Sequence, residues 1–163
     1  MNKILSPDQV SKIAQTLHKQ NKSIILAGGC FDILHIGHIT FLEKAKKQGD
    51  ILILFVENDE TIHKQKGPDR PFNSQHDRAT ILAHLTMVDY VIPLPAFTDN
   101  IEYDDLVKQI KPAIIATTVG DPARKHKERQ AKLVGGRVVD VVPELHNQST
   151  TRLIKLVQQT NQL

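Results

Sequence analysis

Apolar positions along the chain follow two alternating patterns. Five short runs are apolar at most or all positions, and longer segments between them repeat apolar residues every three or four positions. The run 51–56 has no polar alternation at all, which is typical of a strand covered on both faces, as in a parallel sheet. The predicted strands are 23–27, 51–56, 88–92, 112–117 and 137–142.

Helix start and stop residues frame the intervening segments. Ser6 can cap a first helix, Pro7 suits its first turn, and Gln9 stands where a capping box places Glu or Gln. Gly49 is a stop signal for a second helix, and Asp121 with Pro122 opens a later one that Gly135 ends. The predicted helices are 6–20, 36–48, one beginning at Ser74, 101–110, 121–135 and a last one capped by Ser149.

This alternation predicts an α/β protein with a Rossmann-like, doubly wound, parallel five-stranded sheet and helices on both faces. The length of 163 residues suits one domain, with an N-terminal helix at 6–20 and a catalytic core at 22–158. Ligands of such sheets bind beyond the carboxyl ends of the strands. The loops to examine are therefore 28–35, 57–73, 117–121 and 143–149.

The amino-acid composition argues against membranes and nucleic acids as binding partners. The longest apolar run is far short of the ~20 residues that a membrane span needs, and no secretory signal is expected. The single cysteine, Cys30, fits a reducing cytoplasm. A net charge of +3 and 4% aromatic residues argue against nucleic acid, so the run Arg124–Arg129 is interpreted as a charged helix surface.

The chemistry concentrates after the first predicted strand. His35 and His38 lie three positions apart at a helix start, so both rings can project from one face. Gly37 between them leaves room for a phosphate, and a helix N-terminus offers free N–H groups and a partial positive charge. Because the partial positive charge at the helix N-terminus disfavours the charged imidazolium form, the histidines are expected to act mainly as hydrogen-bond donors. No third ligand at zinc spacing is apparent nearby.

Five motifs in order resemble the cytidylyltransferase-like nucleotidyltransferase superfamily. Gly29 to Asp32 is similar to its Gly-x-Phe-Asp loop, and His35 to His38 to its His-x-Gly-His motif. Further similar segments are Lys66-Gly67-Pro68-Asp69-Arg70-Pro71, the helix-opening Arg78, Val88 to Ile92, and Ser149-Thr150-Thr151.

Within that superfamily the chain looks most like the bacterial heptose-phosphate adenylyltransferases. Two departures are visible: Gly28 replaces Asn, and Thr118-Val119-Gly120-Asp121 replaces Lys-Gly-Gly-Asp. Glycerol-3-phosphate cytidylyltransferase is the second candidate, but its Arg-Thr pair before Ser-Thr-Thr is absent here. The third candidate is a regulatory module that binds a nucleotide but does not catalyse its transfer.

The resemblance implies that an acceptor phosphate attacks the α-phosphate of a nucleoside triphosphate, ATP before CTP, and releases pyrophosphate. It implies catalytic roles for His35, His38 and Lys66, and acceptor binding by Arg70. The implied nucleotide contacts are Gly29, Cys30, Phe31, Asp32, Gly37, Arg78, Asp121, Ser149, Thr150 and Thr151. Mg²⁺ is expected to arrive with the triphosphate rather than at a protein metal site, and a homodimer is an expectation from relatives.

Several of these residues have a simpler alternative. Asp32 can order its loop through hydrogen bonds, Arg78 can pair with a nearby carboxylate, and Asp121 can cap the helix that begins at Pro122. Lys66 is expected on a mobile loop, where it and Arg70 could also be solvated charges.

Overall fold

The computed structural model describes residues 2–143. The predicted last helix and its Ser149, Thr150 and Thr151 lie outside the described residues, and so does the predicted second phosphate cradle that they form.

A single five-stranded sheet forms the centre, and every strand pair in it is parallel. The strands are β1 (Ile24–Gly29), β2 (Ile51–Val56), β3 (Tyr90–Pro93), β4 (Ile114–Thr118) and β5 (Arg137–Val142). Their order in the sheet is β3-β2-β1-β4-β5. The chain therefore builds one half of the sheet outward from β1 and then returns to build the other, which confirms the predicted doubly wound architecture.

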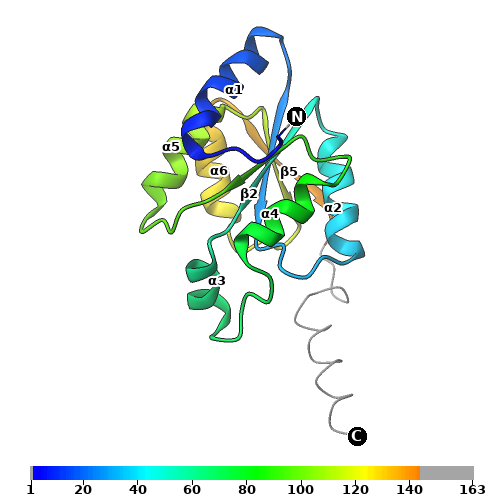
Figure 1. Cartoon of the computed structure of the whole chain (residues 1–163). Helices are drawn as coiled ribbons and strands as arrows, with labels where there is room; N and C mark the ends of the chain where they lie inside the picture. Colours follow the sequence, from blue (N-terminus) through cyan, green and yellow to red (C-terminus); the bar gives the residue numbers. More distant parts are fainter. Residues whose placement is uncertain (1, 144–163) are drawn as a thin grey trace, which may run out of the picture.

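Helices cover both faces of this sheet. They are α1 (Pro7–Lys19), α2 (Ile36–Lys46), α3 (Asp59–Lys66), α4 (Gln75–Ala83), α5 (Asn100–Ile110) and α6 (Arg124–Leu133). Figure 1 shows α2 and α4 on one side of the strands and α1, α5 and α6 on the other, with α3 at the lower end.

Alternate strand residues build two cores. Ile25, Leu52 and Leu54 pack with buried residues of α2 and α4, whereas Leu26 and Ile53 pack with those of α1, α5 and α6. Because successive strand side chains point to opposite faces, a run that is apolar throughout serves both cores. The continuous apolar run of β2 in the sequence is explained by this double coverage.

One helix was not predicted, and another begins later than predicted. The segment 59–66, taken as loop, forms α3. The later helix begins at Arg124 with Ala123 as its N-cap, so Asp121 does not cap it. The carboxylate of Asp121 instead accepts the backbone N–H of Ala123 at 2.8 Å and holds the turn that precedes the helix.

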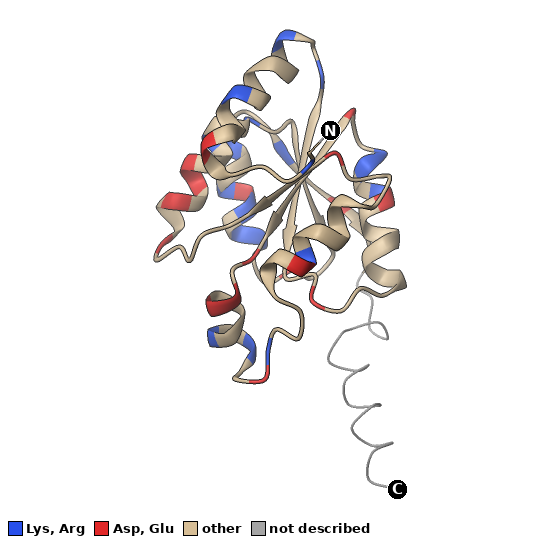
Figure 2. Cartoon of the chain, viewed as in Figure 1, with Lys and Arg blue, Asp and Glu red and all other residues tan. Residues whose placement is uncertain are grey.

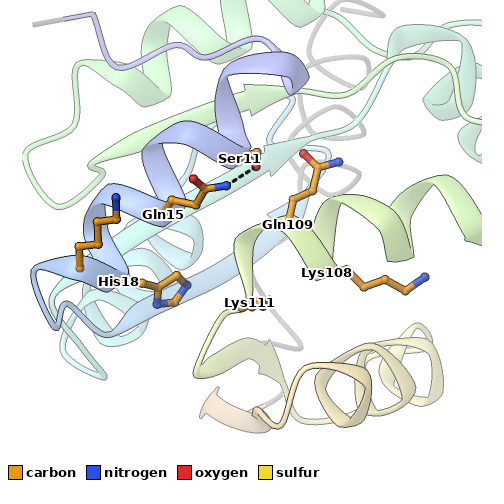
Figure 3. Close-up of a pocket in the computed structure, with 7 residues that line it drawn as sticks. Ser11, Gln15, His18, Lys108, Gln109 and Lys111 are labelled. Atoms are coloured by element: carbon orange, nitrogen blue, oxygen red, sulfur yellow. Dashed lines mark hydrogen bonds between the residues drawn. The ribbon is translucent and has the colours of Figure 1, made fainter.

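The two edges of the sheet differ in what surrounds them. At the carboxyl edge, the order reverses between β1 and β4, which is where ligands of doubly wound sheets bind. Near the amino edge, a second cavity of about 380 Å³ lies between α1 and α5, and Figure 3 shows polar side chains of both helices around it. Within residues 2–143 no helix is both long and apolar enough to span a bilayer.

Candidate functional site

A cleft of about 620 Å³ opens at the carboxyl edge of the sheet. It is bordered by the ends of β1 and β2, by α3, by the first turn of α5 and by α6. Of the predicted site residues, Gly29, Cys30, Lys66 and Asp121 line it. The fold thus brings together positions that are up to about ninety residues apart in the sequence.

His35 and His38 form a stacked pair at the start of α2. Their ring centroids lie 3.9 Å apart with the planes inclined by 30°. The Nδ1 atom of His35 accepts the N–H of Gly37 at 3.1 Å, so His35 is the side-chain N-cap of the helix. Since Nδ1 is an acceptor, the neutral ring of His35 carries its hydrogen on Nε2 and can donate from there.

His38 is the more buried member of this pair. Burial, and then the positive charges of His35 and Lys66, lower the pKa of His38 from 6.5 to about 4. Its Nδ1 atom is buried without a hydrogen-bond partner among the described residues. A neutral ring with an unsatisfied polar atom is suited to hydrogen-bond a ligand and costs free energy when it has none. The influence of Lys66 also shows that this lysine lies near the pair.

The loop before the histidines is shaped by Gly29 and Phe31. Phe31 has φ +46°, a left-handed conformation that costs a non-glycine residue of order 1–3 kcal/mol. Its ring lies 5.5 Å from the ring of His38, and a Cβ on Gly29 would stand 3.2 Å from the ring of Phe31. Gly29 therefore leaves the space in which Phe31 supports His38.

Asp32 orders this loop through hydrogen bonds. Its carboxylate accepts the N–H groups of Phe72 and Asn73 at 2.9 and 3.0 Å and the Nε of Arg70 at 2.7 Å. Burial by itself would raise the pKa of Asp32, but the Asn73 and Phe72 amides and Arg70 outweigh it and hold that pKa below its ordinary value. The structure thus shows Asp32 ordering its loop through hydrogen bonds, which is the simpler alternative for this residue.

Arg70 and Arg78 both have buried guanidinium groups with protein partners. Arg70 pairs with Asp32, and its side chain is only 9% exposed. The Arg78 side chain is fully buried and bonds to Asp59 at 2.6 Å. Neither arginine lines the cleft, and the same is true of Phe31, Asp32, His35, Gly37 and His38. The acceptor contact of Arg70 and the nucleotide contact of Arg78 therefore stay predictions. Pairing with a carboxylate, the alternative for Arg78, is what the structure shows.

Lys66 differs from these arginines because its amine is exposed to the cleft. It is the last residue of α3, rather than part of a mobile loop, and Gly67 ends the helix with φ +98°. Its Nζ has no hydrogen-bond or ion-pair partner within residues 2–143. A free cation at a fixed helix end is well placed to bind an anionic group.

The opposite wall of the cleft holds Lys127, which sequence reasoning missed. Its Nζ lies 2.6 Å from the carboxylate of Asp121, which also accepts a hydrogen bond from the Thr117 hydroxyl. Lys127 belongs to the basic run of α6, visible as blue segments in Figure 2. Arg124 and Arg129 of that run pair with Asp140 and Asp104. No signal in the sequence separates Lys127 from these surface cations.

Glu57 and Tyr103 were also missed. Glu57 follows β2, Tyr103 lies near the start of α5, and the phenol donates to the Glu57 carboxylate at 2.9 Å. Both side chains line the cleft. Burial raises the pKa of Glu57, with the Tyr103 hydrogen bond and the charge of Arg78 acting against that change. Because these residues are 46 positions apart, only the folded chain reveals the pair.

Together, a doubly wound parallel sheet, a helix start carrying two neutral imidazoles and a cleft with a free lysine define a nucleotide-binding α/β protein. The cytidylyltransferase-like family model matches residues 26–159. The chain belongs to this family and is a nucleotidyltransferase.

Curated relatives support the same assignment. Bifunctional protein HldE from Aliarcobacter butzleri is 40% identical over 155 residues, which are 93% of this chain and 30% of the relative. The protein of the same name from Nitratiruptor sp. is 45% identical over 108 residues, 66% of this chain and 22% of the relative. The chain therefore spans only about a third or less of the length of these relatives.

Two solved structures share the fold. A lipopolysaccharide core biosynthesis protein from Thermoplasma volcanium superposes with a TM-score of 0.61 at 28% identity, covering 75% of this chain and 95% of that one. Pantoate-beta-alanine ligase from Francisella tularensis, complexed with beta-gamma ATP and beta-alanine, also gives 0.61 but at 18% identity, covering 98% and 78%. The second likeness shows the fold alone.

Proposed function

We propose that this nucleotidyltransferase transfers AMP from ATP to the phosphate of a sugar 1-phosphate of the heptose class and releases pyrophosphate. The observation that carries the proposal is that the stacked, neutral His35–His38 pair at the start of α2 lies near the free amine of Lys66, which lines the cleft at the carboxyl edge. The resemblance to heptose-phosphate adenylyltransferases and the likeness to a lipopolysaccharide core biosynthesis protein support the choice of acceptor.

The proposed chemistry is an in-line displacement that needs no covalent intermediate with the protein. One oxygen of the acceptor phosphate attacks the α-phosphorus, and the bond from that phosphorus to the bridging oxygen of pyrophosphate breaks. Lys66 binds the negative charge of the two approaching groups, and the imidazoles of His35 and His38 donate hydrogen bonds to the phosphates. The protein contributes alignment and fixed dipoles where charge develops.

Mg²⁺ enters this proposal as part of the triphosphate substrate. Among residues 2–143 no three His, Cys, Asp or Glu side chains are grouped to hold a metal ion. Mg²⁺ keeps much of its water shell and is commonly bound through substrate phosphates and few protein ligands. The imidazoles at the start of α2 and the amine and backbone donors of the cleft suit the phosphate side of such a complex.

The test is a matrix of nucleotides against acceptors, with pyrophosphate release as the readout. ATP, CTP and GTP, each with Mg²⁺, are paired with heptose 1-phosphate, glycerol 3-phosphate, FMN and phosphopantetheine. The expected result is that ATP with the heptose 1-phosphate gives the highest kcat/KM. A maximum with CTP and glycerol 3-phosphate would establish the cytidylyltransferase alternative, and ATP binding with no pyrophosphate would establish a regulatory module.

A pair of histidine variants connects the activity to this site. His38→Ala removes a phosphate donor and is expected to lower kcat by about 10²- to 10³-fold while the protein stays folded. His63→Ala removes an exposed imidazole of α3 and is the matched control. Turnover of His38→Ala within a few-fold of the control would contradict the proposed role.

A further inference from the structure

Glu57 has an unusually fixed position in the cleft. Its N–H donates to the carbonyl of Gly29 at 3.2 Å, and its own carbonyl accepts Nη2 of Arg78 at 2.8 Å. Both backbone groups are therefore tied to neighbouring elements, and Arg78 is itself fully buried.

The carboxylate is held at one oxygen and open at the other. Oε2 accepts the Tyr103 hydroxyl at 2.9 Å, and the Tyr103 ring is braced edge-on by Phe97 with centroids 4.8 Å apart. Oε1 has no partner among the described residues. The side chain is only partly buried, so Oε1 stays accessible to water and to a ligand that donates a hydrogen bond to it.

The other two carboxylates that line the cleft are already used or solvated. Asp121 is bound by Lys127, by the Thr117 hydroxyl and by the N–H of Ala123. Asp99 is exposed and caps α5 by accepting the N–H of Ile101 at 2.8 Å. Among the described residues, only Glu57 of these three is both partly buried and without a protein partner at one carboxylate oxygen.

We propose that Glu57, held in place by Tyr103, is a specificity-determining residue that accepts hydrogen bonds from ring or side-chain hydroxyl groups of the sugar acceptor. This inference rests on the proposed function, because it assumes that a phosphorylated sugar is the second substrate. Tyr103 is a positioning residue that fixes the carboxylate and acts on the acceptor only through it.

Among the chemical groups of the two proposed substrates, hydroxyl groups are the ones that this carboxylate can bind. A carboxylate repels phosphate and attracts groups that donate hydrogen, and one carboxylate without further oxygen ligands is no cation site. Hydroxyl groups are present on the acceptor sugar and on the ribose of the nucleotide. Position favours the acceptor, because Glu57 follows β2, one strand away from the β1/β4 reversal where nucleotides bind in such sheets.

The experiment compares Glu57→Gln with wild type on substrates that lack single hydroxyl groups. Gln can still accept the Tyr103 hydrogen bond, so the cleft keeps its shape and the charged acceptor is lost. With MgATP and heptose 1-phosphate, KM for the sugar phosphate is expected to rise about 10- to 100-fold, the usual value of a hydrogen bond to a charged group. KM for ATP is expected to change less than about 2-fold.

Deoxy analogues show whether the carboxylate contacts the hydroxyl directly. One singly deoxygenated heptose 1-phosphate should bind wild type as weakly as Glu57→Gln binds the parent sugar, and combining the two changes should add little further loss. Additive losses for every analogue would overturn the contact. If the losses from Glu57→Gln and from 2′- or 3′-deoxy-ATP are non-additive instead, the carboxylate binds the ribose. The acceptor assignment is then wrong.

Two further variants complete the test. Glu60→Gln removes the same charge three residues along, from an exposed position paired with Lys64, and should leave both KM values unchanged. Tyr103→Phe should raise the acceptor KM less than Glu57→Gln does, and thermal unfolding checks that each variant is folded. A wild-type protein without activity on any sugar phosphate overturns the proposed function, and this inference with it. Activity with an unchanged acceptor KM in Glu57→Gln overturns this inference alone.

Discussion

At the scale of single residues, the start of α2 favours neutral imidazoles over charged imidazolium rings. His35 and His38 stack at 3.9 Å, and two charged rings at that distance would repel each other. Burial adds to the cost of charge, so the pKa of His38 falls to about 4. In the proposed function the positive charge comes instead from Lys66, whose exposed amine has no protein partner within residues 2–143.

The lowered pKa of His38 has a consequence for stability. In the unfolded chain this imidazole titrates near 6.5, whereas in the folded chain it titrates near 4. Between these values the unfolded state binds more protons, so the free energy of unfolding falls as the pH is lowered through this range. We expect this residue to account for a loss on the order of 2 kcal/mol at pH 4.5.

Urea unfolding at several pH values measures this effect. His38→Gln carries no titrating group, so its stability should fall less than that of wild type between pH 6.5 and 4.5. His63→Gln removes an exposed histidine and should reproduce the wild-type slope. Equal slopes for wild type and His38→Gln would show that the folded imidazole titrates normally.

At the scale of elements, Arg78 joins the segments that form the site. From the first turn of α4 it donates to the carbonyls of Cys30, Glu57 and Asn73 and to the carboxylate of Asp59. These partners belong to the loop after β1, the end of β2, the segment before α4 and the start of α3. One buried side chain therefore fixes the histidine loop relative to the helix that carries Lys66.

Removing this guanidinium should destabilise the protein and loosen the site together. Arg78→Met keeps most of the volume but leaves three carbonyls without their donor, at about 1 kcal/mol each, so a loss of about 3 kcal/mol is expected. Denaturant unfolding measures it, and Arg137→Lys at an exposed strand position is the control. A loss below 1 kcal/mol for Arg78→Met would mean that water replaces these bonds.

The elements also show what the sequence could and could not predict. The strands were predictable because their apolar runs serve two cores, and the Ser6–Gln9 capping box of α1 is confirmed. Helix α3 was not, because Ile62 is its single buried residue and no apolar stripe marks it. The burial of Arg78 and the Glu57–Tyr103 bond depend on contacts between distant segments, which local pattern does not encode.

At the scale of the whole molecule, the cleft lies where the strand order reverses between β1 and β4. The cleft borders both halves of the sheet, since β2 and α3 contribute one wall and α6 another. Basic α6 is held beside acidic positions of α5 through the Arg129–Asp104 pair, as Figure 2 shows by the adjoining blue and red segments. The second cavity lies between α1 and α5 and shares none of the residues of the cleft.

A ligand that contacts both walls of the cleft should stabilise the entire fold. Binding at 100 times the dissociation constant contributes about 2.7 kcal/mol, which for a domain of this size raises the melting temperature by roughly 5–11 °C. We expect that shift with MgATP and a much smaller one with adenosine, because the donors of the site suit phosphates. Differential scanning fluorimetry across a concentration series measures both.

Two lysine variants locate the binding that causes this shift. Lys66→Ala removes the free amine of the cleft and should move the ATP titration to higher concentration by about tenfold, as expected for one lost charged contact. Lys19→Ala removes an exposed amine from the cavity between α1 and α5 and should leave the titration where it is. If Lys19→Ala weakened ATP and Lys66→Ala did not, the phosphates would bind at the amino edge. The reversal of strand order would then no longer explain where this sheet binds its nucleotide.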